Sequence, residues 1–216
     1  MRNINTILFD LDGTLLDTLE DLADSVNFVL KEFGYPSVSL ENVRNYVGNG
    51  VARLMELSLP DGKGNPQFEE CLAKFKERYA GHMQDKTKPY QGIPELLQQL
   101  WRKYHMAVVS NKFDSAVKGL VKDYFHPYIT VALGESEKIK KKPAPDMVFK
   151  ALEELNADAR NAIYVGDSEV DVQTAKNAGL ICVGVAWGFR NAEVLTRAGA
   201  HMVINKPNEL LTLLNR

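Results

Sequence analysis

The stretch Ile7-Leu8-Phe9-Asp10-Leu11-Asp12-Gly13-Thr14 places two acidic residues directly after an apolar run. The apolar part is typical of a buried strand, which we expect over residues 4–10. Because alternate side chains of a strand point to the same side, Asp10 and Asp12 can converge on one point just beyond it. Gly13 allows the chain to turn away there. Taken alone, this pattern is equally compatible with a polar strand end followed by an ordinary turn.

The composition is typical of a soluble globular protein with a sizeable core. The chain has 216 residues, 45% hydrophobic and 25% charged, which suits one large domain or two smaller ones. A net charge of -2 and a pI near 6.1 give no overall attraction to nucleic acid or to acidic membranes, so we expect neither partner. We expect no signal peptide, because a strand is predicted within a few residues of Met1, and no apolar run approaches the roughly 20 residues of a membrane span. Cys71 and Cys182 have no metal-like spacing, which favours reduced thiols and a cytoplasmic location.

A change in pattern along the chain predicts an inserted helical domain. Apolar residues recur at helical spacing over residues 18–33, and Gly34 follows as a stop signal. Further helices are predicted at 40–46, 51–57 and 68–83, with no convincing strand among them. We therefore expect a helical cap at residues 17–86, inserted into a core made of residues 1–16 and 87–216.

The remainder of the chain alternates short apolar strands with helices. Strands are predicted at 106–110, 129–132, 162–165 and 181–185, and helices at 93–104, 115–125, 145–156 and 168–178. Residues 202–204 and 208–214 add one more pair. This alternation predicts an α/β fold with a parallel sheet covered on both faces. Ligands of such sheets bind beyond the carboxyl ends of the strands, where Asp10 stands.

The stretch Gly166-Asp167-Ser168-Glu169-Val170-Asp171 repeats the arrangement of the first acidic pair, because it also follows a predicted strand. The two clusters are therefore expected at one edge of the sheet. Several converging carboxylates repel one another, and the usual remedy is a hard cation with oxygen ligands, most simply Mg²⁺. Asp167 is a candidate ligand, and Asp171 either ligates the metal directly or supports a ligand. Ser168 and Asp171 also fit the cap of a helix.

Two further segments offer groups suited to a phosphate. Ser110, Asn111 and Lys112 follow the apolar residues of a predicted strand and supply a hydroxyl, an amide and an ammonium. Lys142, followed by Pro143, supplies a cation that would stabilise charge in a water-poor site, although a solvated basic loop is the simpler interpretation of its run of lysines. The candidates for contacting the rest of the substrate are Asn49, Arg53, Lys112 and Arg190. For the two arginines, the alternative is that they are solvated surface charges.

In order and spacing, Asp10-Leu11-Asp12-Gly13-Thr14, Ser110-Asn111, Lys142-Pro143 and the 166–171 stretch resemble the four motifs of the haloacid dehalogenase-like hydrolase superfamily. The resemblance spans nearly the whole chain. Within the superfamily, the segments that look most like those of phosphoglycolate phosphatases are residues 10–18, 47–50, 89–92 and 110–112. This resemblance implies a Rossmann-like core that carries an inserted helical cap.

The same resemblance implies roles for individual residues. Asp10 would be the nucleophile that forms an aspartyl-phosphate, and Asp12 would be the general acid and base. Ser110 and Lys142 would bind the phosphoryl group. Mg²⁺ would be held by Asp10, by the backbone carbonyl of Asp12 and by Asp167. Such a pathway is chemically reasonable, because transfer to a carboxylate divides hydrolysis into two easier steps.

Several functions fit these residues. The preferred one is a Mg²⁺-dependent phosphatase for a small phosphorylated metabolite, with phosphoglycolate as the expected substrate and pyrophosphate or a sugar phosphate as alternatives. A phosphomutase such as β-phosphoglucomutase shares the paired aspartates and the cap, but its second motif usually differs. Dehalogenase chemistry does not need Asp12. The complete set of acidic, hydroxyl and basic groups argues against a non-catalytic binding protein. Both a monomer and a homodimer are compatible with the sequence.

Overall fold

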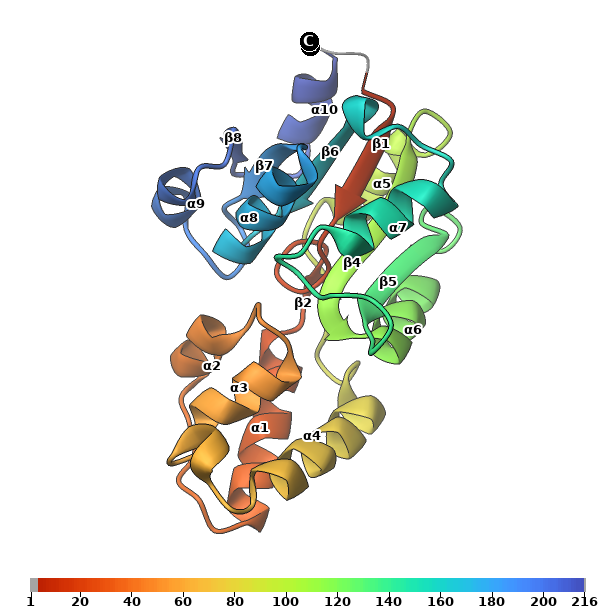
Figure 1. The fold of residues 1–216 in the computed structure, drawn as a ribbon. Helices are drawn as coiled ribbons and strands as arrows, with labels where there is room; N and C mark the ends of the chain where they lie inside the picture. The colour runs from red at the N-terminus through yellow and green to blue at the C-terminus, as the bar shows by residue number, and fades with distance from the viewer. Residues whose placement is uncertain (1–3, 216) are drawn as a thin grey trace. The chain divides into compact units, whose positions relative to one another are not determined.

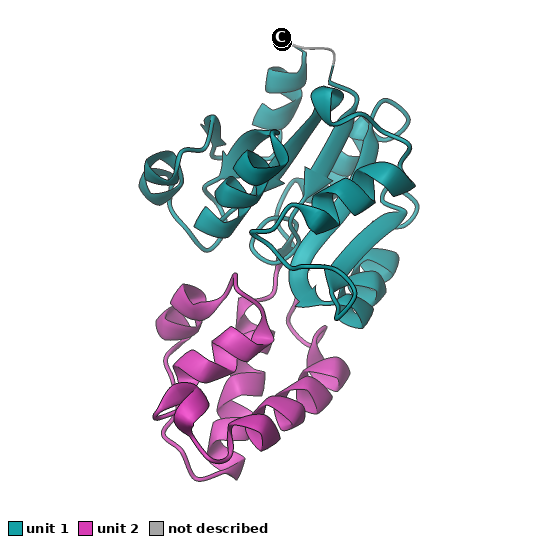
Figure 2. Cartoon of the chain, viewed as in Figure 1, with its two compact units in different colours: residues 1–16, 89–216 teal, residues 17–88 magenta. Residues whose placement is uncertain are grey.

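The computed structural model describes residues 4–215, which form two compact units (Figure 2). The sheet unit comprises the described residues up to Leu16 and those from Pro89 onward, and the helical unit comprises residues 17–88. Among residues 4–215, no helix combines the length and apolar character needed to cross a lipid bilayer.

The sheet unit is built on six parallel strands in the order β5-β4-β1-β6-β7-β8 (Figure 1). The strands are β1 Thr6–Phe9, β4 His105–Phe113, β5 Val131–Glu135, β6 Ala162–Gly166, β7 Ile181–Val185 and β8 Met202–Ile204. The chain order runs outward in both directions from the centre of the sheet, so β1 and β6 lie at its switch point. The predicted α/β fold with a parallel sheet is confirmed.

Helices pack on both faces of this sheet, with α7 and α8 in front of it in Figure 1. They are α5 Ile93–Leu100, α6 Asp114–Phe125, α7 Asp146–Glu154, α8 Glu169–Ala178, α9 Ala192–Ala198 and α10 Glu209–Leu214. One buried cluster joins Met147 of α7 and Val172 of α8 to Leu8 and Tyr164 of the sheet. Because side chains alternate along a strand, the face that holds Leu8 is also the face toward which Asp10 is directed.

The helical unit consists of α1 Leu19–Glu32, α2 Leu40–Tyr46, α3 Val51–Ser58, a 3₁₀ turn at Gly62–Gly64 and α4 Phe68–His82. The buried residues of α1 recur at helical spacing, as the sequence predicted, and Gly34 follows its end with a φ of 77°. Residues 18–87 are all described and contain no strand. The chain enters and leaves this unit through β2 Leu16–Asp17 and β3 Lys88–Pro89, which pair in a separate small sheet.

Two strands have different bounds from those predicted. The strand predicted at 106–110 continues as β4 to Phe113, because Phe113 pairs with Glu135 of β5 beyond a register shift that follows Val109. Residues 110–112 therefore lie within the strand and not in a loop after it. β5 correspondingly begins at Val131, two residues later than expected for the strand at 129–132.

The helix predicted at 93–104 is also too long. α5 ends at Leu100, where Trp101 has a ψ of 140° and Arg102 has a φ of 70°. Apolar periodicity continues through this region, but the backbone turns to enter β4. Trp101 is consequently 36% exposed.

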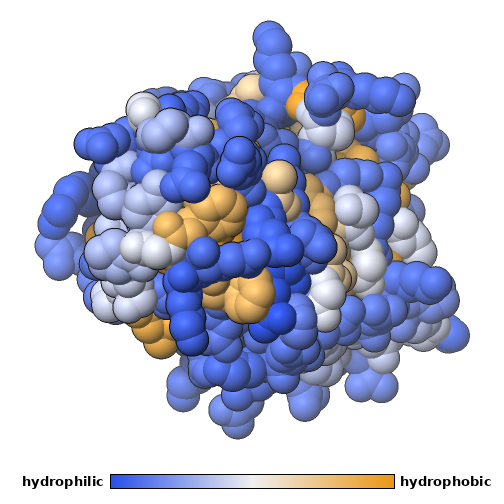
Figure 3. Space-filling model, turned by 90° about the horizontal axis from the view of Figure 1, so that it is seen from below, coloured by the Kyte–Doolittle hydropathy of each residue, from blue (hydrophilic) through white to orange (hydrophobic). Residues whose placement is uncertain are grey.

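The surface carries few large apolar side chains. The face seen in Figure 3 is mostly hydrophilic, and its apolar areas are small and interrupted by polar side chains. The exposed large hydrophobic residues among those described are Phe28, Leu40, Leu57, Trp101 and Phe149.

Candidate active site

Side chains from the carboxyl ends of neighbouring strands meet in the sheet unit. Asp10 directly follows β1, and Asp167 directly follows β6. Residues 110–112 lie near the end of β4, and Lys142 joins the group from the loop that precedes α7. Because β1 lies between β4 and β6, the strand order brings the three segments at the strand ends together.

The ammonium group of Lys142 is at the centre of these contacts. Its Nζ lies 2.9 Å from Asp10 Oδ1, 2.8 Å from Asp171 Oδ1 and 3.1 Å from the hydroxyl oxygen of Tyr164. An ammonium has three donors, so these three acceptors match its capacity. Burial by itself lowers the pKa of Lys142, but the Asp10 and Asp171 carboxylates outweigh burial and hold that pKa well above its ordinary value. The side chain therefore remains cationic inside the protein.

Asp10 is fixed by the backbone as well as by Lys142. Its N–H donates to the carbonyl of Val165 at 2.9 Å, and its Oδ1 accepts from the N–H of Leu11 at 2.7 Å. Burial and the nearby Asp171 carboxylate raise the pKa of Asp10 to about 7, although Lys142 opposes the increase. The carboxylate thus has a defined orientation, which is what a nucleophile in a positioned reaction needs.

Asp171 lies in the first turn of α8 with both of its oxygens in use. Oδ2 accepts from the Ser168 N–H at 3.0 Å, while the Asp171 N–H donates to Ser168 Oγ at 3.4 Å, and these two bonds form a capping box. Oδ2 also accepts from the Ser168 hydroxyl at 2.6 Å. Oδ1 faces Lys142. A Cβ atom on Gly166 would lie 2.4 Å from the Cβ of Asp171, so a glycine is needed there for this approach. Asp171 therefore makes the helix cap that the sequence offered for it, together with an ionic contact to Lys142 that the sequence did not predict.

Asp167 is buried and accepts two hydrogen bonds. The N–H of Phe189 donates to its Oδ2 at 2.7 Å, and the Thr14 hydroxyl donates to its Oδ1 at 3.3 Å. Burial, followed by the Asp171 and Asp10 carboxylates, raises the pKa of Asp167 well above its ordinary value. One oxygen from each of these three aspartates lies within 4.8 Å of the others, and all three residues are buried.

The loop after β7 packs against Asp167 through a close backbone contact. The indole Nε1 of Trp187 donates to the carbonyl of Thr14 at 3.0 Å. A Cβ atom on Gly188 would lie 2.2 Å from the carbonyl oxygen of Gly13, and one on Gly13 would lie 2.2 Å from Asp167 Oδ2. Because Gly13 and Gly188 have no side chains, Asp167 fits between the loop after β1 and the loop after β7.

Asn111 hydrogen-bonds to the backbone of Lys142 in both directions. Its Nδ2 donates to the Lys142 carbonyl at 3.0 Å, and its Oδ1 accepts from the Lys142 N–H at 2.8 Å. Ser110 is 2% exposed, and its Oγ accepts from the N–H of Lys112 at 3.3 Å. The amide that the sequence offered as a phosphate ligand thus fixes the loop carrying Lys142.

Lys112 forms a second buried ion pair in the site. Its Nζ lies 3.0 Å from both Asp12 Oδ1 and Asp12 Oδ2. The Lys112 side chain is 1% exposed and that of Asp12 is 12% exposed. The two lysines therefore face different aspartates, with Lys142 beside Asp10 and Lys112 beside Asp12.

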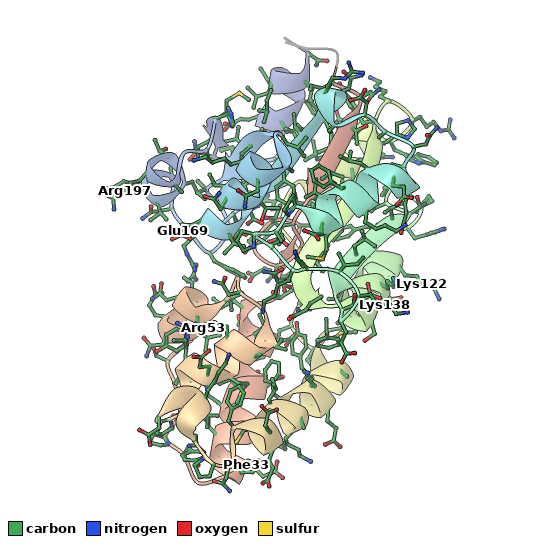
Figure 4. All side chains as sticks on the ribbon, in the orientation of Figure 1. Phe33, Arg53, Lys122, Lys138, Glu169 and Arg197 are labelled. Atoms are coloured by element: carbon green, nitrogen blue, oxygen red, sulfur yellow. The ribbon has the colours of Figure 1, made fainter. Side chains whose placement is uncertain are left out.

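The other predicted substrate-contacting residues are divided between the two units. Arg190 belongs to the sheet unit, where its Nε lies 3.1 Å from Glu169 Oε2. Arg53 lies on α3 of the helical unit, with its Nη1 2.8 Å from Glu56 Oε1, and its side chain is 46% exposed (Figure 4). Asn49 is exposed in the same unit.

The donor set of the sheet-unit site fits a hard divalent cation. The Lys142 ammonium faces Asp10 and Asp171, and the Lys112 ammonium faces Asp12. Asp167 adds a fourth carboxylate beside Asp10 and Asp171. When all six groups are ionised, two negative charges are left without compensation. Burial is the main cause of the raised pKa values of Asp10 and Asp167, and the neighbouring carboxylates raise them further. Oxygen ligands and this charge suit Mg²⁺ better than a softer metal.

Three contributions to the site were missing from the sequence prediction. They are the Tyr164 hydroxyl, the Thr14 hydroxyl and the loop at 187–189. Tyr164 has a visible signal, because it is a polar residue inside an apolar strand that precedes the second acidic cluster. Gly188 also has one, because it follows a strand end, as Gly13 does.

Comparison with known proteins assigns the chain to a family. A model of the haloacid dehalogenase-like hydrolase family matches residues 7–185, which is more than half of the chain. The chain belongs to this family. A phosphoglycolate phosphatase from Aquifex aeolicus (strain VF5) is 34% identical over 218 residues, covering 98% of this chain and 97% of the relative. One from Vibrio parahaemolyticus is 33% identical over 218 residues, covering 97% and 96%.

A solved structure shows the same fold throughout its length. The crystal structure of a protein from Lactobacillus delbrueckii subsp. bulgaricus, provisionally assigned as a phosphoglycolate phosphatase, superposes with a TM-score of 0.92. It is 32% identical and covers 98% of both chains. The recognised resemblance to haloacid dehalogenase-like hydrolases is confirmed, and the enzyme class of this family member is phosphoric monoester hydrolase.

Proposed function

We propose that this chain is a Mg²⁺-dependent phosphatase that hydrolyses a small phosphate monoester, with phosphoglycolate preferred, through an aspartyl-phosphate on Asp10. The observation that carries the proposal is the buried contact of 2.9 Å between Lys142 Nζ and Asp10 Oδ1. It places a permanent cation beside a carboxylate at the carboxyl end of the central strand. The names of the relatives supply the choice of phosphoglycolate.

The two steps of the reaction use two aspartates. In the first step an Asp10 oxygen attacks phosphorus, the bond from phosphorus to the ester oxygen breaks, and Asp12 gives a proton to the leaving oxygen. In the second step water attacks phosphorus, gives its proton to Asp12 and releases inorganic phosphate from Asp10. Ser110 and Lys142 bind the phosphoryl oxygens. Phosphoryl transfer depends chiefly on such positioning and on charge neutralisation.

The metal and the supporting residues have separate tasks. Asp10, Asp167 and the backbone carbonyl of Asp12 would hold Mg²⁺, which supplies charge neutralisation when it is bound. Asp171 orients Lys142 and is not itself assigned as a metal ligand, because its two oxygens already face Lys142 and Ser168.

Asn111 fixes the backbone of Lys142, and we assign it this positioning role instead of phosphate binding. We also propose that the helical insertion acts as the cap. Asn49 and Arg53 are its candidate contributions to substrate choice.

A phosphate-release screen with Mg²⁺ tests this function. Wild-type protein and Asp10→Asn are assayed on phosphoglycolate, pyrophosphate, sugar phosphates and nucleotides, with and without chelation of divalent ions. We expect phosphoglycolate to give the highest kcat/KM, chelation to remove the activity, and Asp10→Asn to show no turnover. Acid-quenched wild-type protein should carry one acid-stable but alkali-labile phosphoryl group, which Asp10→Asn should lack.

Two results would contradict separate parts of the proposal. Full activity after chelation would exclude the metal dependence. A labile phosphoryl group on Asp10→Asn would exclude Asp10 as the nucleophile. Conversion of a sugar phosphate to its isomer without phosphate release would instead show a phosphomutase.

A further inference from the structure

The site contains two buried lysines, and the proposed reaction uses only one of them. Lys142 faces Asp10 and Asp171, so it belongs to the half of the site in which the phosphoryl group is transferred. Lys112 faces Asp12, the proposed acid and base. A second buried cation on the side of the leaving group has no task in the reaction as described above.

The distances place Lys112 close to the atoms that leave. Its Nζ lies 3.0 Å from both oxygens of Asp12. Asp12 must hydrogen-bond to the ester oxygen in order to protonate it, so that oxygen lies within about 6 Å of the ammonium. An anionic group attached one or two carbons from the ester oxygen falls inside this range. A lysine ammonium is a compact point charge on a flexible stem, which can face a protein carboxylate and a substrate anion together.

We infer that Lys112 binds a second anionic group on the alcohol half of the substrate. The substrate class is therefore a small phosphate monoester whose alcohol carries a carboxylate, or an equivalent anion, one or two carbons from the ester oxygen. This inference rests on the proposed function and deepens it. It assigns part of the substrate selectivity to β4 of the sheet unit, whereas the sequence had placed most candidate residues in other segments.

A matched pair of esters isolates this contact. Phosphoglycolate and phosphoglycolamide differ only in that an uncharged amide replaces the carboxylate. Hydrogen bonds to charged groups change affinity by roughly 10- to 100-fold, so wild-type protein should prefer phosphoglycolate by about that factor in kcat/KM. Lys112→Met should remove most of this preference, because its loss on phosphoglycolate should exceed its loss on the amide.

The comparison of two esters within one variant separates binding from other roles of Lys112. Any disturbance of Asp12 affects both esters, because both need protonation of the same oxygen. Lys112→Arg keeps the charge and should retain part of the preference. Lys118→Met is the matched control, because Lys118 is 60% exposed, pairs with Asp114 on α6 and should leave the preference unchanged.

Four outcomes would overturn the inference, the last of them together with the proposed function. Equal losses of Lys112→Met on the two esters would mean that Lys112 acts through Asp12 alone. A wild-type protein that does not distinguish the two esters would exclude the contact even if Lys112→Met fails to fold. Release of phosphate from the amide but not from phosphoglycolate would exclude it as well, while leaving the phosphatase function intact. Release from neither ester, nor from an aryl phosphate, would instead remove the proposed function and this inference with it.

Discussion

Tyr164→Phe tests whether the Tyr164 hydroxyl positions the cation of the site. The hydroxyl donates to the Val109 carbonyl at 3.0 Å and lies 3.1 Å from Lys142 Nζ. The substitution keeps the ring in its buried place and removes only the oxygen. Lys142 then retains Asp10 and Asp171 as acceptors, and its third donor loses its partner.

The size of the effect follows from the contact that is lost. A hydrogen bond to a charged group contributes roughly 1.5–3 kcal/mol, so kcat/KM should fall about 10- to 100-fold if the ammonium is misplaced in the transition state. The Val109 carbonyl also loses a donor, which should lower the free energy of unfolding by roughly 1–3 kcal/mol. At about 2–4 °C per kcal/mol for a protein of this size, Tm should fall by several degrees.

Three measurements separate positioning from simple destabilisation. Steady-state kinetics on phosphoglycolate give kcat and KM, inhibition by inorganic phosphate gives the affinity for the phosphoryl group, and thermal unfolding gives Tm. Tyr79→Phe is the control, because Tyr79 is also fully buried but lies in the helical unit. A Tyr164→Phe protein with lower Tm but unchanged kinetics and unchanged phosphate inhibition would refute the positioning role.

Three further predictions concern the remaining site groups. Asp12→Asn should release a burst of phenol from an activated aryl phosphate, because that leaving group needs little protonation. Turnover should then be slow, because no base activates the water. A similar burst in Asp10→Asn would contradict the assignment of Asp10 as nucleophile and Asp12 as acid and base. Gly188→Ala should lower Mg²⁺ affinity and Tm, because its Cβ would lie 2.2 Å from the Gly13 carbonyl oxygen; unchanged calorimetric Mg²⁺ binding would show that the loop yields freely. The pKa of Asp10 is raised from 3.8 to about 7, so between these pH values the metal-free folded state binds a proton that the unfolded state does not. The stability that Asp10 contributes through this proton is lost as pH rises toward 7. Mg²⁺ binding at pH 6 should therefore release protons. Binding heats at pH 6 that do not depend on the ionisation enthalpy of the buffer would contradict this.

The parallel sheet was predictable because its signals are local. Apolar runs bounded by turn residues indicate strands, and the alternation with helices requires parallel connections. Once the sheet is parallel, its carboxyl ends share one edge, which is why Asp10 and Asp167 could be expected near each other. The extension of β4 to Phe113 was not predictable, because it depends on pairing with Glu135 of a different strand.

The hydrogen-bond partners of the site side chains were harder to predict than which segments of the chain lie close together. Asn111 has the same chemistry whether its amide faces a phosphate or a backbone, and only the path of the loop before α7 decides between them. Tyr164 and Phe189 contribute through a hydroxyl and a backbone N–H. Almost every residue type has a backbone N–H, so the sequence does not indicate that Phe189 donates to Asp167, and only the structure shows this contact.

The excess negative charge of the site destabilises the fold, and the same charge favours the proposed chemistry. Four carboxylates around two ammonium groups are unfavourable when buried, and the raised pKa values of Asp10 and Asp167 express this cost. The same excess of negative charge attracts a divalent cation and repels a phosphate dianion. We therefore expect a site of this kind to bind the cation before the ester, since the cation brings the local charge to balance. Lys142 alone cannot replace it, because Lys142 is already one of the two ammonium groups in this count.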